Sequence, residues 1–191
     1  MKRKIAIFAS GSGTNAEEII KYFQDHENIE ISMILSNNPK AFVLQRAEKH
    51  KIPHQVFTRN EYYKERKVDR ILKSGGIDFI VLAGFMWLVP ERFVKNYPNR
   101  IVNIHPALLP KYGGKGMYGN FVHEAVKKNN EKESGITIHW VNESYDEGNI
   151  IFQAKCTLNS DDTPDDIASK VHKLEYLHYP KVIEKVVLGT L

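Results

Sequence analysis

An asparagine and a histidine lie two positions apart at the end of an apolar stretch, Ile101-Val-Asn-Ile-His105. Residues i and i+2 of a β-strand point to the same face, so Asn103 and His105 are predicted to project together where the strand ends. An amide can donate to a developing oxyanion, and an imidazole changes its charge near neutral pH. The pair suits a reaction that moves a proton, although a histidine at a strand end is more often a satisfied or solvent-facing side chain.

A glycine-rich segment, Gly11-Ser-Gly-Thr-Asn15, separates the first apolar run from a helical pattern. The free N–H groups of a helix start, together with polar side chains in such a segment, can bind a phosphate. With Ala16 the segment also fits the dinucleotide pattern G-x-G-x-x-A, but Ser36-Asn-Asn-Pro39, after the second strand, lacks the acid that a dinucleotide ribose needs. We therefore favour a phosphate monoester, with a plain tight turn as the alternative.

Three further segments offer candidate ligand contacts. Asp146 lies in a polar loop between two predicted strands; it is either an ordinary turn residue or a carboxylate that faces His105 and raises the histidine pKa. Glu175, on the last predicted helix, either holds a cationic amine or belongs to a solvated helix face. The apolar loop Gly84–Pro90 follows a buried strand, where it either receives a flat aromatic ligand or is ordinary core.

The elements that must position these residues alternate between strand and helix patterns. Continuous apolar runs predict buried parallel strands at 5–9, 29–36, 54–57, 77–83 and 101–105, with helices at 15–24, 41–50 and 61–73. Later patterns predict a helix at 121–128, antiparallel strands at 135–141 and 150–157, and a last helix that opens at Thr163-Pro164. We expect an α/β protein, with a Rossmann-like, doubly wound, mostly parallel sheet and an antiparallel C-terminal strand pair, in one domain over residues 1–191.

Composition limits the partners and the location. The chain has 191 residues with a net charge of +4, which is too small to indicate nucleic-acid binding. The apolar run after the basic N-terminus is too short for a secretory signal or a membrane span, and the single cysteine, Cys156, excludes an internal disulfide. No histidine pattern has metal-ligand spacing. We therefore expect a cytoplasmic monomer or homodimer with small-molecule ligands and no metal, nucleic-acid or membrane partner.

Four segments together resemble one protein family: Gly11–Asn15, Val81–Met86, Asn103-Ile-His-Pro-Ala-Leu-Leu-Pro-Lys-Tyr112 and Asp146-Glu-Gly148. Over nearly its whole length the chain resembles the folate-dependent formyltransferases, and its glycine-rich loop is similar to that of the branch acting on glycinamide ribonucleotide in purine biosynthesis. The resemblance implies 10-formyltetrahydrofolate as formyl donor and co-substrate. It also implies that the acceptor is the amine of N1-(5-phospho-D-ribosyl)glycinamide.

The resemblance also implies a role for each segment. The catalytic residues would be Asn103, His105 and Asp146. The substrate phosphate is expected at Gly11, Ser12, Gly13, Thr14 and Asn15, and the glycinamide end at His172, Lys173, Leu174 and Glu175. The folate is expected at Lys64, Arg66, Met86, Trp87, Leu88, Val89, Asn103, Asn142, Glu143, Ser144, Tyr145 and Asp146. The sequence departs from the family at Trp87, where arginine is frequent, in the loop Gly113–Gly119, and at Glu147.

Three alternative functions remain at this point. The same core serves the hydrolysis of 10-formyltetrahydrofolate and the formylation of methionyl-tRNA, but those enzymes normally carry an additional domain. We expect neither domain, because the sequence begins at the first strand and ends at Leu191. A non-catalytic nucleotide-binding module is the third alternative, and the complete set of Asn103, His105 and Asp146 counts against it.

Overall fold

The computed structural model describes residues 1–191 and contains a seven-stranded sheet in the order β3-β2-β1-β4-β5-β6-β7. The parallel strands are β1 Arg3–Phe8, β2 Ile29–Ser36, β3 His54–Val56, β4 Phe79–Leu82 and β5 Ile101–His105. Strand β6 Glu133–Trp140 and strand β7 Ile150–Thr157 continue the sheet in antiparallel pairing. The predicted fold class, including the antiparallel C-terminal pair, is therefore confirmed.

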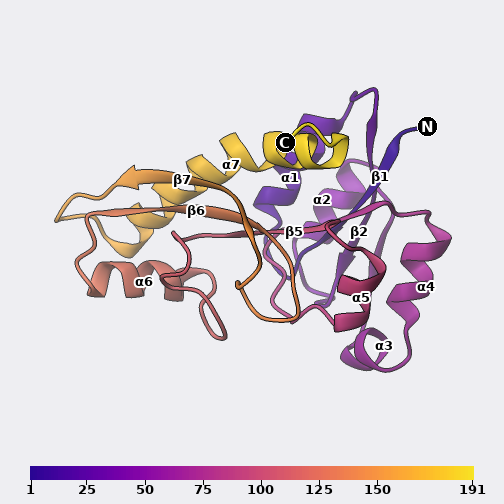
Figure 1. Cartoon of the computed structure of the whole chain (residues 1–191), viewed down its shortest axis with the longest axis horizontal. Helices are drawn as coiled ribbons and strands as arrows, with labels where there is room; N and C mark the ends of the chain where they lie inside the picture. The colour runs from indigo at the N-terminus through magenta and orange to yellow at the C-terminus, as the bar shows by residue number, and fades with distance from the viewer.

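Helices cover both faces of the sheet, as the unbroken apolar strands require (Figure 1). One core packs the sheet against α1 Thr14–Phe23, α2 Val43–Lys49, α6 Asn120–Lys128 and α7 Pro164–Leu188. The other packs it against α3 Arg59–Tyr63, α4 Lys67–Ser74 and α5 Glu91–Asn96. Strand β1 contributes side chains to both cores, because Ile5 and Ile7 point into the first core and Ala6 and Phe8 point into the second. None of these helices combines the length and apolar character needed to cross a membrane.

Two local features differ from the sequence prediction. The helix expected over 61–73 is two helices, because Arg66 adopts a left-handed backbone with φ 53° and separates α3 from α4. A capping box between Thr58 and Glu61 also starts α3 two residues earlier than expected. The short helix α5 was not predicted, since a segment of six residues with one buried side chain, Phe93, carries almost no periodic signal.

The order of the strands places a crevice at one edge of the sheet. The chain winds outward from β1 to β2 and β3, then returns to lay β4 on the other side of β1. In such a sheet the loops that follow the two central strands diverge to opposite faces, and ligands bind between them. The loops that leave β1, β4 and β5 therefore border a common opening.

The long helix α7 is fixed to this region through one buried hydroxyl. The side chain of Tyr179 is fully buried, and its hydroxyl donates to the carbonyl of Leu82 at 2.8 Å and lies 3.3 Å from that of Val102. Glu175 precedes Tyr179 by one helical turn and so projects from the same side of the helix. The tyrosine thus sets the position of Glu175 relative to the carboxyl ends of β4 and β5.

We predict that Tyr179→Phe lowers the free energy of unfolding by about 1–2 kcal/mol, because one buried hydrogen bond is lost without loss of ring volume. The measurement is urea denaturation. Tyr176→Phe is the matched control on the same helix, since the Tyr176 ring stacks on His172. Equal stability of the Tyr179→Phe variant and the parent protein would contradict the anchoring role.

Candidate active site

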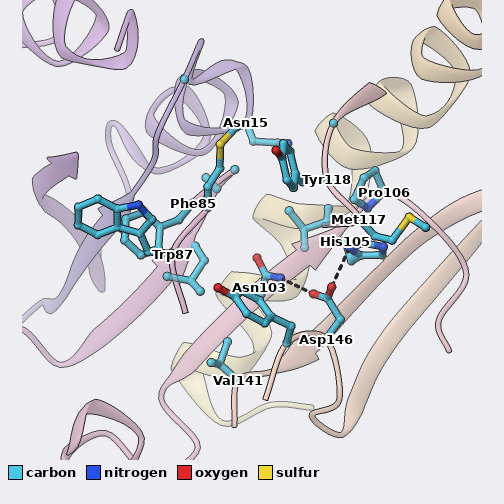
Figure 2. A pocket seen from close by; sticks show the side chains of 18 of the residues that line it. Asn15, Phe85, Trp87, Asn103, His105, Pro106, Met117, Tyr118, Val141 and Asp146 are labelled. Atoms are coloured by element: carbon cyan, nitrogen blue, oxygen red, sulfur yellow. Dashed lines mark hydrogen bonds and ion pairs between the residues drawn. The ribbon is translucent and has the colours of Figure 1, made fainter. Parts of the chain in front are cut away.

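A cavity of about 520 Å³ opens at the carboxyl ends of β1, β4 and β5, and Figure 2 shows several of its side chains converging. The residues around it come from the loops after these strands, from the loop between β6 and β7, and from α6 and α7. The predicted site residues that line it are Gly11, Ser12, Gly13, Thr14, Asn15, Met86, Trp87, Leu88, Val89, Asn103, His105, Ser144, Tyr145, Asp146, His172 and Glu175. The structure therefore brings most of the candidate residues to one place.

Six candidate residues do not line the cavity: Lys64, Arg66, Asn142, Glu143, Lys173 and Leu174. Lys64 and Arg66 are exposed in the break between α3 and α4, and Lys173 is exposed on α7. Asn142 supports its own loop, with its side-chain oxygen accepting from the N–H of Ser144 at 3.0 Å. Arg59, which does not line the cavity either, is the basic side chain beside Trp87, with its guanidinium 5.6 Å from the ring centre.

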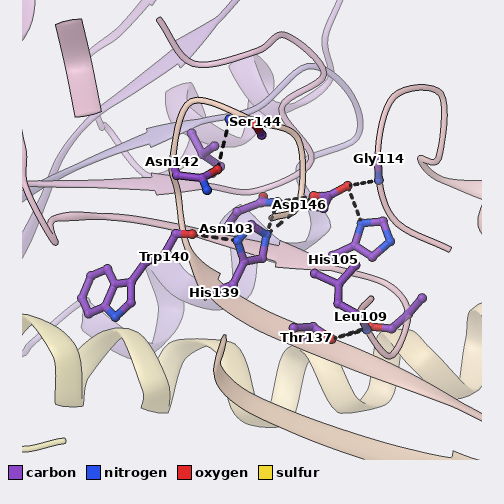
Figure 3. A network of polar contacts seen from close by, with 12 residues as sticks. Asn103, His105, Leu109, Gly114, Thr137, His139, Trp140, Asn142, Ser144 and Asp146 are labelled. Carbon is purple, nitrogen blue, oxygen red and sulfur yellow. Dashed lines mark hydrogen bonds and ion pairs between the residues drawn. The ribbon is translucent and has the colours of Figure 1, made fainter. Parts of the chain in front are cut away.

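Asp146 is the centre of the polar network in this cavity (Figure 3). Its Oδ2 accepts from the backbone N–H of Gly114 at 3.1 Å and lies 3.4 Å from Nδ1 of His105. Its Oδ1 lies 3.4 Å from Nδ2 of Asn103 and 3.6 Å from Nε2 of His139. Burial raises the pKa of this carboxyl, but its contacts with His139, His105 and Gly114 outweigh burial, and the pKa of Asp146 is lowered. Asp146 is therefore an ionised carboxylate at neutral pH.

His105 is nearly inaccessible and has two acceptors beside its ring. Its Nε2 donates to the carbonyl of Tyr112 at 2.7 Å, while Nδ1 faces Asp146. Burial lowers the pKa of His105, although both acceptors act to raise it. Asp146 thus faces His105 and acts to raise its pKa, as one interpretation of the sequence expected, but burial has the larger effect and the net shift is downward. The imidazole is neutral at rest, with the lone pair of Nδ1 free to accept a proton beside a carboxylate.

His139 completes the network and was not recognised from the sequence. In the antiparallel pairing of β5 and β6 it lies directly opposite Asn103. Its Nδ1 lies 2.9 Å from the carbonyl oxygen of Trp140, and its Nε2 lies 3.1 Å from Nδ2 of Asn103. The imidazole thereby fixes the orientation of the Asn103 amide. The alternation of Thr137 and His139 against an apolar face was visible in the sequence, but the partner strand was not.

The glycine-rich loop has the geometry of an anion site. Helix α1 begins at Thr14, with Gly13 as N-cap at φ 70°, and a Cβ at Gly13 would lie 2.5 Å from Val43. The close contact with Val43 thus requires glycine at position 13, and the first N–H groups of α1 have no acceptor within the helix, which leaves them available to an anion. Asn15 extends the site toward α7, because its Nδ2 donates to Glu175 at 3.0 Å.

A buried ion cluster supports this loop from behind. Glu17 on α1 lies 3.3 Å from a guanidinium nitrogen of Arg46 and 3.0 Å from Nε2 of His50. Burial raises the pKa of Glu17, but the hydrogen bonds to His50 and Arg46 prevail and lower it to about 2. Arg46 in turn donates through Nε to the carbonyl of Ser12 at 2.8 Å. The cluster thus links α1 and α2 to the loop.

The opposite end of the cavity is apolar and aromatic. Trp87 contacts a group of rings behind it, with Phe57 at 6.0 Å, Tyr62 at 5.9 Å and Phe85 at 6.4 Å between ring centres. Tyr62 is fully buried, and Arg92 binds the backbone carbonyls of Tyr62 and Tyr63 from the far side. This wall is rigid and suits a flat, partly apolar ligand.

The comparisons with known proteins agree with this geometry. The chain matches the formyl transferase family over residues 3–183. It is 36% identical to the chloroplastic phosphoribosylglycinamide formyltransferase of Arabidopsis thaliana, over 95% of this chain and 64% of the plant protein. It is 34% identical to the phosphoribosylglycinamide formyltransferase of Haemophilus influenzae, over 99% of this chain and 89% of that protein.

A solved structure is similar over the same length. The phosphoribosylglycinamide formyltransferase of Anaplasma phagocytophilum superposes with a TM-score of 0.89 and 32% identity, covering 99% of this chain and 89% of that one. The chain thus spans less than two thirds of the plant relative but most of the bacterial proteins.

We predict that Asp146→Asn lowers the pKa of His105 further below its ordinary value of 6.5. The carboxylate favours the imidazolium, so after its removal the carbonyl of Tyr112 is the main group left to oppose burial. The measurement is an NMR titration of the ring resonances. Glu147→Gln, the adjacent exposed carboxylate, is the control and should leave the titration of His105 unchanged. A rise in the His105 pKa on Asp146→Asn would contradict the assignment.

Proposed function

This chain belongs to the formyl transferase family, and we propose that it transfers a formyl group from 10-formyltetrahydrofolate to the amine of N1-(5-phospho-D-ribosyl)glycinamide. The reaction is a step of de novo purine biosynthesis, and we place it in the cytoplasm, with the protein acting as a monomer or homodimer. The observation that carries the proposal is the meeting of Asn103, His105 and Asp146 in one cavity. The glycine-rich loop Gly11–Asn15 and the aromatic side chains of Phe85 and Trp87 line the same cavity.

The two ends of the cavity fit the two substrates. The phosphate of the ribonucleotide would bind the N–H groups at Gly13, Thr14 and Asn15, where the helix dipole favours an anion. The folate would lie along Met86–Val89 and Tyr145, with Trp87 supplying an aromatic face rather than a cation. Arg59 would meet the acidic tail of the folate from its place beside Trp87. The amine and the formyl carbon would then meet beside Asn103 and His105.

The proposed reaction begins when the amine nitrogen attacks the formyl carbon. A C–N bond forms, the formyl oxygen becomes an oxyanion, and the nitrogen loses a proton to Nδ1 of neutral His105. The new imidazolium is stabilised by Asp146 and by the carbonyl of Tyr112, and its positive charge would stabilise the oxyanion electrostatically. An N–H of Asn103, held by His139, donates to the same oxygen.

Collapse of the tetrahedral intermediate completes the transfer. The bond between the formyl carbon and N10 of the folate breaks, and N10 receives the proton that His105 carries. The imidazole returns to its neutral state, so no net proton is taken up or released. Burial of His105 supports this cycle, because it keeps the resting ring neutral while its two acceptors favour the charged ring once the proton arrives.

The proposal is tested by a spectroscopic assay of folate turnover with and without glycinamide ribonucleotide. We expect turnover only when the ribonucleotide is present, with one formyl group recovered on the product for each folate consumed. Turnover without it would indicate the hydrolase, in which water replaces the amine. No turnover under either condition would favour the non-catalytic binding module.

We predict that Asp146→Ala lowers kcat by at least about a hundredfold, because the imidazolium loses its counter-charge and the loop at Gly114 loses its anchor. Glu147→Ala removes the neighbouring carboxylate of the same loop and should leave kcat within about twofold of the parent. Near-normal turnover by a folded Asp146→Ala variant, verified by circular dichroism and thermal melting, would remove Asp146 from the mechanism.

A further inference from the structure

A second buried histidine, His123, lines the cavity without a hydrogen-bond partner. It lies on α6 and is only 2% exposed, yet none of its ring atoms makes a hydrogen bond, and its Nδ1 is fully buried. A neutral imidazole carries one N–H donor and one acceptor nitrogen. Buried polar groups in folded proteins are nearly always paired, so an unpaired ring on a cavity wall indicates that a ligand supplies the partner.

The neighbours of His123 connect it to Glu175 and to the glycine-rich loop. Helices α6 and α7 pack together, and the His123 ring lies 6.4 Å from that of His172 at an angle of 76°. Nδ1 of His172 is 2.8 Å from Oε2 of Glu175, the oxygen that also accepts from Asn15 of the phosphate loop. His123 thus belongs to the wall between the phosphate loop and His105.

The charge state of His123 selects the chemistry of its partner. Burial, with the nearby His172, lowers its pKa to about 4, so the ring is neutral at pH 7. A neutral ring adds no charge for a phosphate and offers no anion to an amine. Its Nδ1 is enclosed, so a ligand in the cavity can reach only Nε2, which donates or accepts according to the tautomer. A hydroxyl is the complementary group in either case, since it also donates and accepts.

We propose that His123 is a substrate-binding residue that hydrogen-bonds a hydroxyl of the sugar between the phosphate and the amine. The inference rests on the function proposed above, which places a pentose between the phosphate loop and Asn103. Binding through a neutral side chain would orient the sugar, and with it the amine, without disturbing the charges of Asp146 and Glu175. His123 would therefore help the protein distinguish a ribosyl from a deoxyribosyl substrate.

The test combines changes in the protein with changes in the substrate. Glycinamide ribonucleotide and its 2′-deoxy and 3′-deoxy analogues are assayed with the parent protein, with His123→Phe and with His123→Gln. Phenylalanine keeps the ring but removes both nitrogens, whereas glutamine keeps a donor and an acceptor near the position of Nε2, the nitrogen that is not enclosed. His178→Phe is the matched control, because His178 packs on Phe152 and does not line the cavity.

We expect the parent protein to lose roughly five- to tenfold in kcat/KM on one of the two deoxy analogues, as for one lost neutral hydrogen bond. On the ribosyl substrate, kcat/KM of His123→Phe should be lower than that of the parent by a similar factor. On the deoxy analogue that the parent disfavours, kcat/KM of His123→Phe should equal that of the parent. His123→Gln should recover part of the loss in kcat/KM, and His178→Phe should match the parent. Thermal melting of each variant separates these effects from unfolding.

Equal losses on all three substrates in His123→Phe would overturn the inference, because they would mean that the residue acts only through packing. If the parent protein shows no formyl transfer, the proposed function fails by itself. Calorimetric binding of the ribonucleotide and its deoxy analogues to the same variants then decides the role of His123. A weaker Kd of His123→Phe for the ribonucleotide, but not for the disfavoured deoxy analogue, would support the inference. An equal weakening of Kd for both compounds would overturn it.

Discussion

A carboxylate withdrawn from water must be neutralised by its neighbours, and the arrangement of the cavity follows from how this is done for Asp146. Its two oxygens contact the backbone of Gly114 and the side chains of Asn103, His105 and His139. These partners come from β5, from β6 and from the loop Gly113–Gly119 before α6. Satisfying one buried charge therefore fixes three separate parts of the chain against each other.

The cavity also shows how differently one residue type can be used. Burial lowers the pKa of His105, although two acceptors oppose this shift. Burial and the neighbouring His172 lower the pKa of His123 to about 4. The hydrogen bond to Glu175 raises the pKa of His172. The first ring suits a proton that arrives and leaves, the second suits a neutral hydrogen bond, and the third suits a standing ion pair. Distance from Asp146 and Glu175 separates the three roles.

The sequence predicted the sheet and most of the cavity because both depend on local signals. Apolar runs identify parallel strands, and in a doubly wound sheet the residues that follow them, such as Thr14 and Asn103, must gather at one edge. The contact of His139 with Asn103 depends instead on strand register, which a single sequence does not display. The lowered pKa of His105 is equally non-local, because it depends on burial by segments distant in the sequence. The left-handed Arg66 was missed, since nothing in its residue type demands that backbone.

The site is divided between two parts of the sheet that differ in how firmly they are held. The glycine-rich loop, Asn103 and His105 belong to the parallel strands, each flanked by others, whereas Asp146 lies on the connection to β7, an edge strand that pairs only with β6. Edge hairpins open locally more often than central strands do. Such an opening would withdraw Asp146 while the loop Gly11–Asn15 stays folded. Heat would then abolish turnover below the temperature at which the sheet melts, and amide hydrogens in β7 would exchange with solvent before those in β1.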